Sequence, residues 1–161
     1  MTGAHGCGKT TTSKKIAEKS KFQTLPSVAR TSPYEVETAE NQRFIMNKVY
    51  ARCLNYDNYI HERTPVDVIS YTKLMKLESE YNHQKMKVEA FFRGMAHAGS
   101  PIFYFPIYFD LEHDGIRPGL DEQVEVDKFI HDYLETNGIP YYTIPDTTPE
   151  ERADFILERV A

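Results

Sequence analysis

The chain has 161 residues, of which 40% are hydrophobic and 27% charged, and its formal net charge at pH 7 is −5. These values are ordinary for one globular domain, and they argue against a disordered chain and against a broad basic surface for nucleic acids. The two cysteines form no C-x-x-C pair, and no apolar run reaches membrane-spanning length. We expect a cytoplasmic protein with one domain over residues 1–161 and no membrane partner.

The first element is a glycine-rich segment. Residues 3–10 read G-A-H-G-C-G-K-T, which matches the pattern G-x-x-x-x-G-K-[ST] at every fixed position. Glycines allow successive backbone N–H groups to point at phosphate oxygens. Lys9 is then placed to reach the β- and γ-phosphates, and the hydroxyl of Thr10 to bind Mg²⁺. The segment predicts a loop that binds a nucleoside triphosphate.

The flanks of this loop differ from each other. Residues 11–19 predict a helix, whose N-terminal dipole favours a bound anion. Only Met1 and Thr2 stand before the loop, which is too little for the strand that usually precedes it. Two explanations stay open: the true start lies upstream, or the fold accepts a two-residue stub.

Strands and helices then alternate. Apolar periodicity, together with proline at helix starts and glycine at helix ends, predicts helices at 36–54, 66–78, 82–99, 121–138 and 146–160. Runs of β-branched and aromatic residues predict strands within 22–30, 58–65, 101–109 and 139–145. We expect the aromatic strand at 101–109 to be buried on both faces. The alternation predicts an α/β fold with a parallel sheet covered on both sides.

Ligands of such sheets bind at the carboxyl ends of the strands. The glycine-rich loop, the segment E-R-T at 62–64 and a polar, lid-like segment at about 110–122 all open on that edge. Arg63 is a candidate to hold a phosphoryl acceptor. Glu62 is a candidate to polarise an acceptor hydroxyl or to position the water of a metal, and Arg117 to close over the phosphates.

Four segments carry a resemblance to a known group: G-A-H-G-C-G-K-T-T, L-P-S-V-A-R, E-R-T-P-V-D-V-I-S-Y and D-G-I-R-P. They resemble the P-loop nucleoside and nucleotide kinases. More narrowly, they are similar to the AAA-associated ATPase/kinase-like family that includes ribosylnicotinamide kinase domains and is common in phages. E-R-T is also similar to the D/E-R-S signature of deoxynucleoside kinases. The resemblance implies a three-layer P-loop NTPase fold with a central, mostly parallel sheet, and ATP and Mg²⁺ as cofactors.

The resemblance also implies site residues. It implies that Arg63 and Arg117 approach the transferred phosphoryl group or the acceptor. Together with Lys9 and Glu62 they make up the expected catalytic set, and Thr10 and Glu62 are expected at the metal. It implies contacts with ATP from Gly3, His5, Gly6, Cys7, Gly8, Lys9, Thr10 and Thr11 at the phosphates, and from Pro145 and Asp146 at the adenine. Many relatives carry a glutamate where this chain has Ser27. If that glutamate is the catalytic base, the candidates here are Glu62, Asp67 and Glu35.

The leading hypothesis is ATP-dependent phosphoryl transfer to a nucleoside, a deoxynucleotide or a modified pyrimidine, in the cytoplasm of the host cell if a phage encodes the protein. One alternative is a kinase that acts on a hydroxymethylated base in phage DNA, against which the acidic net charge weighs. Another is a nucleotide-binding switch or ATPase without a small acceptor, which Ser27 favours.

Overall fold

The structure is a computed structural model that describes residues 1–25, 27–55, 58–109 and 119–160. Helices and strands alternate along most of this chain. In order, they are α1 (Lys9–Lys19), β1 (Gln23–Thr24), the short 3₁₀ helix η1 (Ala29–Thr31), α2 (Ala39–Asn55), β2 (Tyr59–Ile60), α3 (Pro65–Leu74), α4 (Glu78–Ala98), β3 (Phe103–Tyr104), α5 (Leu120–Thr136), β4 (Tyr142–Thr143) and α6 (Pro149–Val160).

The strands form two parallel pairs with the start of the chain between them. β1 pairs with β2, Gln23 opposite Tyr59, and β3 pairs with β4, Phe103 opposite Tyr142. Thr2 forms an isolated parallel bridge beside β3: its N–H donates to the Phe103 carbonyl at 2.8 Å, and its carbonyl accepts from the N–H of Phe105 at 2.9 Å. The backbone before the phosphate loop is therefore anchored to β3.

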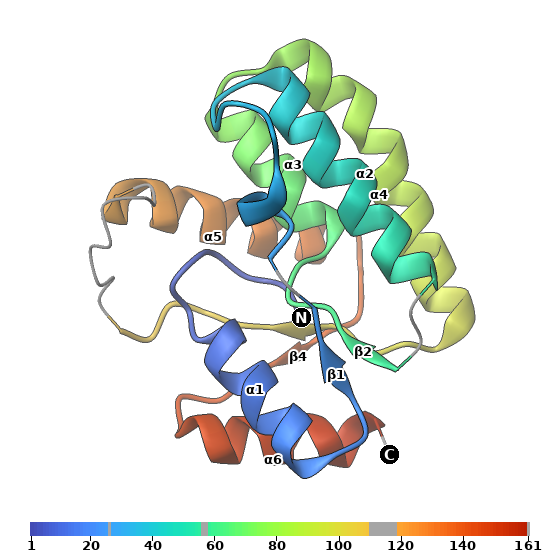
Figure 1. The fold of residues 1–161 in the computed structure, drawn as a ribbon, viewed down its shortest axis with the longest axis vertical. Coiled ribbons are helices and arrows are strands. Elements are labelled where there is room, and N and C mark those ends of the chain that lie inside the picture. The colour runs from blue at the N-terminus through green and yellow to red at the C-terminus, as the bar shows by residue number, and fades with distance from the viewer. Residues whose placement is uncertain (26, 56–57, 110–118, 161) are drawn as a thin grey trace.

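Helices cover both sides of these strands (Figure 1). α1 and α6 lie together on one side, and α2, α3, α4 and α5 lie on the other. Each side has its own apolar core. Ile16 and Ile156 belong to the α1–α6 core, whereas Met46, Ile69 and Ile130 belong to the core of the other four helices. The three layers confirm the expected α/β fold, in which helices cover parallel strands on both sides.

α3 is the most enclosed helix, because residues 65–72 are all buried. Thr64 caps its start, and Pro65 follows at the first position, where a missing N–H costs no hydrogen bond. Asp67 completes a capping box with Thr64. A helix that is buried on every side is held by its neighbours rather than by one apolar stripe, so its capped start is fixed in space.

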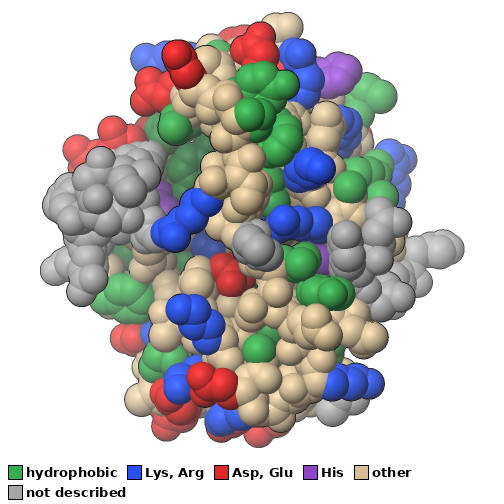
Figure 2. All heavy atoms as spheres, viewed as in Figure 1, with side chains coloured by type: hydrophobic (Ala, Val, Ile, Leu, Met, Phe, Trp, Pro, Cys, Tyr) green, Lys and Arg blue, Asp and Glu red, His purple; other side chains and the backbone are tan. Residues whose placement is uncertain are grey.

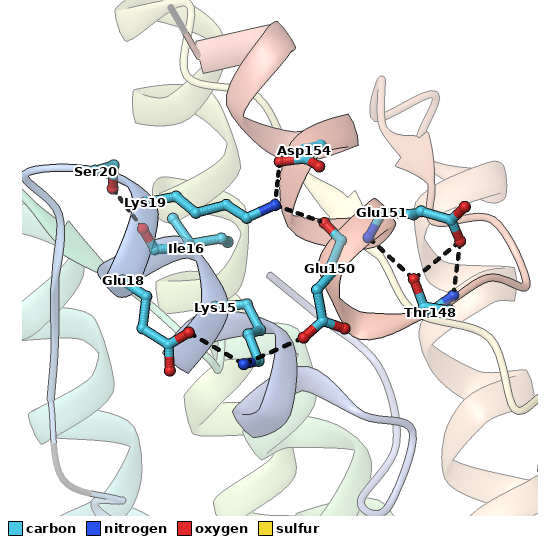
Figure 3. A network of polar contacts seen from close by, with 9 residues as sticks. All are labelled: Lys15, Ile16, Glu18, Lys19, Ser20, Thr148, Glu150, Glu151 and Asp154. Atoms are coloured by element: carbon cyan, nitrogen blue, oxygen red, sulfur yellow. Dashed lines mark hydrogen bonds and ion pairs between the residues drawn. The ribbon is translucent and has the colours of Figure 1, made fainter.

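The start of α6 is attached to α1 by charged side chains (Figure 3). Lys15 pairs with Glu150 at 3.1 Å and Lys19 with Asp154 at 2.6 Å. The carboxylates of Glu18 and Glu150 raise the pKa of Lys15, and Lys15 lowers the pKa of Glu150. Pairs this exposed add little to stability, but they align the two helices beside the phosphate loop.

The strands are shorter than the sequence predicts. Of the aromatic run at 101–109, only Phe103 and Tyr104 form a regular strand, although the burial expected for it is found from Ile102 to Phe105. The helix expected at 66–78 ends at Leu74, and the chain turns through Lys76, whose φ is 57°. None of the helices in the described part of the chain is both long and apolar enough to cross a membrane.

Candidate phosphate-binding site

The loop from Gly3 to Thr10 depends on glycine conformations. Gly3, Gly6 and Gly8 have φ values of 143°, 75° and 90°, which other residues rarely adopt. A Cβ on Gly3 would also lie 2.5 Å from the carbonyl oxygen of Phe105. The loop therefore has the backbone that a phosphate cradle needs, packed directly on the residues after β3.

Lys9 closes the loop on itself. Its ammonium donates to the carbonyl of Gly3 at 2.7 Å and to that of Ala4 at 2.5 Å, and lies 3.3 Å from the sulfur of Cys7. The Cys7 thiol in turn donates to the Ala4 carbonyl at 3.0 Å. The Lys9 side chain thus connects the first turn of α1 to the residues where the loop begins.

Glu62 joins the segment after β2 to the first turns of α1. One carboxylate oxygen accepts a hydrogen bond from the Thr10 hydroxyl at 2.6 Å, and the other accepts from the Ser13 hydroxyl at 2.5 Å. Thr10 and Glu62 were both expected at the metal, and the structure brings them into direct contact. Among the described residues, no group of three His, Cys, Asp or Glu side chains is arranged to hold a metal ion.

Asp67 anchors the beginning of the loop. Its carboxylate accepts from the hydroxyl of Thr2 at 2.8 Å and from the backbone N–H of Gly3 at 3.0 Å. The same carboxylate accepts from the backbone N–H of Thr64 at 2.7 Å and from its hydroxyl at 2.8 Å. Asp67 is 1% exposed. With both oxygens bound inside the protein, it is arranged to position the loop rather than to take a proton from a substrate.

His5 connects the loop to Arg63 through Tyr71. The Tyr71 hydroxyl lies 2.8 Å from Nδ1 of His5 and accepts from the His5 backbone N–H at 3.2 Å. The guanidinium of Arg63 lies 5.3 Å from the centre of the Tyr71 ring. Gln123 on α5 donates to the His5 carbonyl at 2.6 Å. Burial raises the pKa of Tyr71, while the charges of Arg63 and Lys9 lower it, so the phenol stays neutral at physiological pH.

The segment after β4 also reaches the loop. The carboxylate of Asp146 lies 3.4 Å from Nη2 of Arg152, and Nη1 of Arg152 would lie 3.0 Å from a Cβ on Gly8. Asp146 is therefore connected to the loop through Arg152. The adenine contact expected of Pro145 and Asp146 stays a prediction.

Other expected residues are more peripheral. Thr11 is exposed in the first turn of α1, and Ser27 and Glu35 are exposed on the segment before α2. Arg117 and most of the lid-like segment lie outside the described residues, and residues 120–122 belong to α5. Figure 2 shows basic side chains, with acidic ones among them, around the middle of the face where the loop and α1 meet.

Three site residues were not expected from the sequence: Ser13, Gln123 and Arg152. Ser13 follows Thr10 by one helical turn, so the spacing offered a signal for a shared contact. Asp67, expected only as a base candidate, was identifiable as a structural anchor from the spacing T-P-V-D, which fits a capping box. Gln123 and Arg152 act across the fold, and no local pattern marks them.

Comparisons with known proteins agree with this arrangement. A family model described as an AAA domain matches residues 1–152. Among solved structures, a deoxyadenosine kinase from M. mycoides with bound dCTP matches with a TM-score of 0.62 and 14% sequence identity, covering 99% of this chain and 96% of that one. No curated protein matches. At this identity the likeness shows the fold, while the family match covers nearly the whole chain. The protein belongs to the AAA domain family.

Proposed function

We propose that this protein transfers a phosphoryl group from ATP to a hydroxyl of a nucleoside, a deoxynucleotide or a modified pyrimidine. The contact between Glu62 and the first turns of α1 carries this proposal. It holds the E-R-T segment, which resembles a signature of deoxynucleoside kinases, beside a loop that fits a triphosphate. Because Arg63 directly follows Glu62, the contact also keeps the candidate acceptor-binding arginine close to the loop. The shared fold with a deoxyadenosine kinase supports the same reaction class.

The residues present fit Mg²⁺ and ATP. Mg²⁺ prefers oxygen ligands and is usually bound by one or two protein groups together with phosphates and water. The Thr10 hydroxyl and the Glu62 carboxylate offer such oxygens side by side. When bound, the ion neutralises charge on the β- and γ-phosphates. Because both oxygens of Glu62 face α1, the metal role suits it better than proton abstraction.

Lys9 and Arg63 supply the remaining positive charge. The Lys9 ammonium binds two loop carbonyls, which are weaker partners than a phosphate oxygen, so Lys9 can exchange them for a phosphate of ATP. Arg63 lies over Tyr71, which contacts His5 of the loop, and its guanidinium would stabilise charge on the transferred group. Neutral Tyr71 holds both Arg63 and His5 in place.

The test is ADP release by the purified chain with Mg·ATP and a panel of nucleosides, deoxynucleoside monophosphates and modified pyrimidines. We expect release that depends on one class of acceptor. Lys9→Ala should lower this activity by at least about 100-fold, the usual cost of losing one charge-stabilising donor. Lys14→Ala, which removes an exposed lysine of the same helix, is the matched control and should keep full activity.

Two other outcomes would redirect the proposal. ADP release that no acceptor changes would favour a switch or ATPase, the function that Ser27 suggests. Transfer only to DNA that carries hydroxymethylated bases would assign the reaction to a DNA-modifying kinase. No nucleotide-dependent stabilisation of the wild-type chain would overturn the proposal, since a ligand at 100 times its dissociation constant stabilises a fold by about 2.7 kcal/mol.

A further inference from the structure

Arg152 on α6 is a buried cation with little compensation. Its side chain is 5% exposed, and its contact with a carboxylate is a 3.4 Å pair between Nη2 and Asp146, whose own side chain is 67% exposed. The Nε–H has no hydrogen-bond partner in the part of the chain that the structure describes. Buried guanidinium groups are normally bound by several acceptors. Arg152 therefore keeps much of its positive field.

This charge lies against the phosphate loop. A Cβ on Gly8 would be 3.0 Å from Nη1 of Arg152 and 3.3 Å from Cζ of Phe109. The guanidinium also lies 5.7 Å from the ring centre of Tyr108 and 5.6 Å from that of Phe109. The Tyr108 hydroxyl donates to the Ile144 carbonyl at 2.8 Å, which holds the Tyr108 ring in place. The guanidinium is thus enclosed between aromatic rings and the loop backbone, one residue before Lys9.

We propose that Arg152 is a positioning residue of the phosphate site: it supports the backbone at Gly8 and adds positive potential to the loop without touching the ligand. The ligand class is a polyphosphate, whatever base is attached to it. A buried charge acts at longer range than an exposed one because salt and water screen it less. The inference rests on the proposed function only in requiring that the loop bind a triphosphate.

The experiment measures binding of Mg·ATP and of magnesium tripolyphosphate, which has no base, by calorimetry. Arg152→Gln should weaken both by roughly 10-fold, and Arg152→Lys, which keeps the charge, should weaken both less. The KM for ATP should rise while kcat at saturating ATP changes little, because the charge acts before the phosphoryl group moves. Adenosine binding should not change.

Arg159→Gln is the matched control. Arg159 lies on the same helix, with its guanidinium 3.5 Å from the ring centre of Phe155 and 5.5 Å from that of Tyr142. The substitution removes the same kind of arginine–aromatic contact at a site remote from the loop. It should leave tripolyphosphate affinity unchanged.

Asp146→Asn tests the same charge effect with the opposite expected result, which is tighter binding. Asp146 is exposed, so the fold should tolerate the replacement. Removing this carboxylate leaves Arg152 less compensated, so tripolyphosphate should bind about two- to three-fold more tightly. This variant decides the question if Arg152→Gln does not fold.

Several results would overturn the inference. One is unchanged polyphosphate affinity in folded Arg152→Gln, and another is equal losses in the Gln and Lys variants, which would indicate shape rather than charge. Weaker binding of ATP but not of tripolyphosphate in Arg152→Gln would indicate a contact with the base. Weaker binding of tripolyphosphate in Asp146→Asn would contradict the expected effect of removing a negative charge. If Lys9→Ala loses binding while the Arg152 variants do not, the proposed function stands and only this inference fails.

Discussion

Asp127 on α5 shows how one residue's surroundings can make stability depend on pH. Its Oδ2 accepts from the Tyr104 hydroxyl at 2.9 Å, whereas its Oδ1 is buried without a hydrogen-bond partner among the described residues. Burial raises the pKa of Asp127 above its ordinary value of 3.8, and the Tyr104 hydrogen bond opposes this only in part. The folded state therefore binds this proton more tightly than the unfolded state does.

The direction of this pH dependence follows from the linkage between proton binding and folding. The contribution of Asp127 to stability is complete below its unfolded pKa and is lost as the pH rises through its raised, folded pKa. We predict that Asp127→Asn, which keeps an acceptor for Tyr104, loses less free energy of unfolding than the wild type as the pH rises from the ordinary pKa of 3.8 through the raised, folded pKa. Urea titrations at intervals across this range measure the difference. The exposed Asp132→Asn is the control, and a pH dependence equal to that of the wild type in both variants would contradict the prediction.

The residues of the site differ in how far the sequence revealed them. The loop was predictable because its chemistry is local: glycines, a lysine and a threonine at fixed spacing make a cradle wherever they occur. Glu62 and Arg63 required the further rule that ligands gather at the carboxyl ends of strands. Gln123 and Arg152 come from helices that follow the loop by more than 100 residues. Their contacts depend on tertiary packing, which no spacing encodes.

At the scale of elements, helices were predicted better than strands. The apolar periodicity of α2, α5 and α6 is visible in the sequence, and so are the stop at Gly138 and the cap at Thr148. The length of a strand depends instead on its partners. β3 pairs with Thr2 and β4 over few residues, and Pro101 and Pro106, which have no N–H to donate, stand on either side of it in the sequence.

The start of α6 supports a prediction about an element. The Thr148 hydroxyl accepts from the N–H of Glu151 at 3.3 Å, and the Glu151 carboxylate accepts from the N–H of Thr148 at 3.1 Å. We predict that Thr148→Ala lowers the free energy of unfolding by about 1 kcal/mol, the usual cost of a lost N-cap. Chemical denaturation measures it. Thr147→Ala, at the exposed neighbouring position, should change stability far less, and equal losses would argue against capping.

At the scale of the whole molecule, two apolar cores lie on opposite sides of one set of strands (Figure 1). Phe103 belongs to the α1–α6 core, whereas its neighbour Tyr104 belongs to the other, so β3 contributes to both. If β3 separated from either core, the other core would also lose a buried aromatic side chain. We therefore expect the two sides to unfold together, as one domain.

This expectation can be measured with one substitution in each core. Ile156→Ala and Ile130→Ala should each lower the free energy of unfolding by about 2–4 kcal/mol. In both variants the chain should still unfold in a single urea transition, with a lower midpoint. Far-UV circular dichroism and tyrosine fluorescence should report the same transition, since the chain has no tryptophan. Separate transitions for the two probes in either variant would show that the sides fold independently.

The position of Asp67 has a consequence for how this protein can evolve. One carboxylate accepts hydrogen bonds from Thr2 and Gly3 before the loop and from Thr64 at the start of α3. A substitution that satisfied the helix alone would release the loop, and one that satisfied the loop alone would uncap the helix. Change at this position therefore requires simultaneous changes in two segments about sixty residues apart. Selection for nucleotide binding and selection for a stable helical core act here on the same side chain.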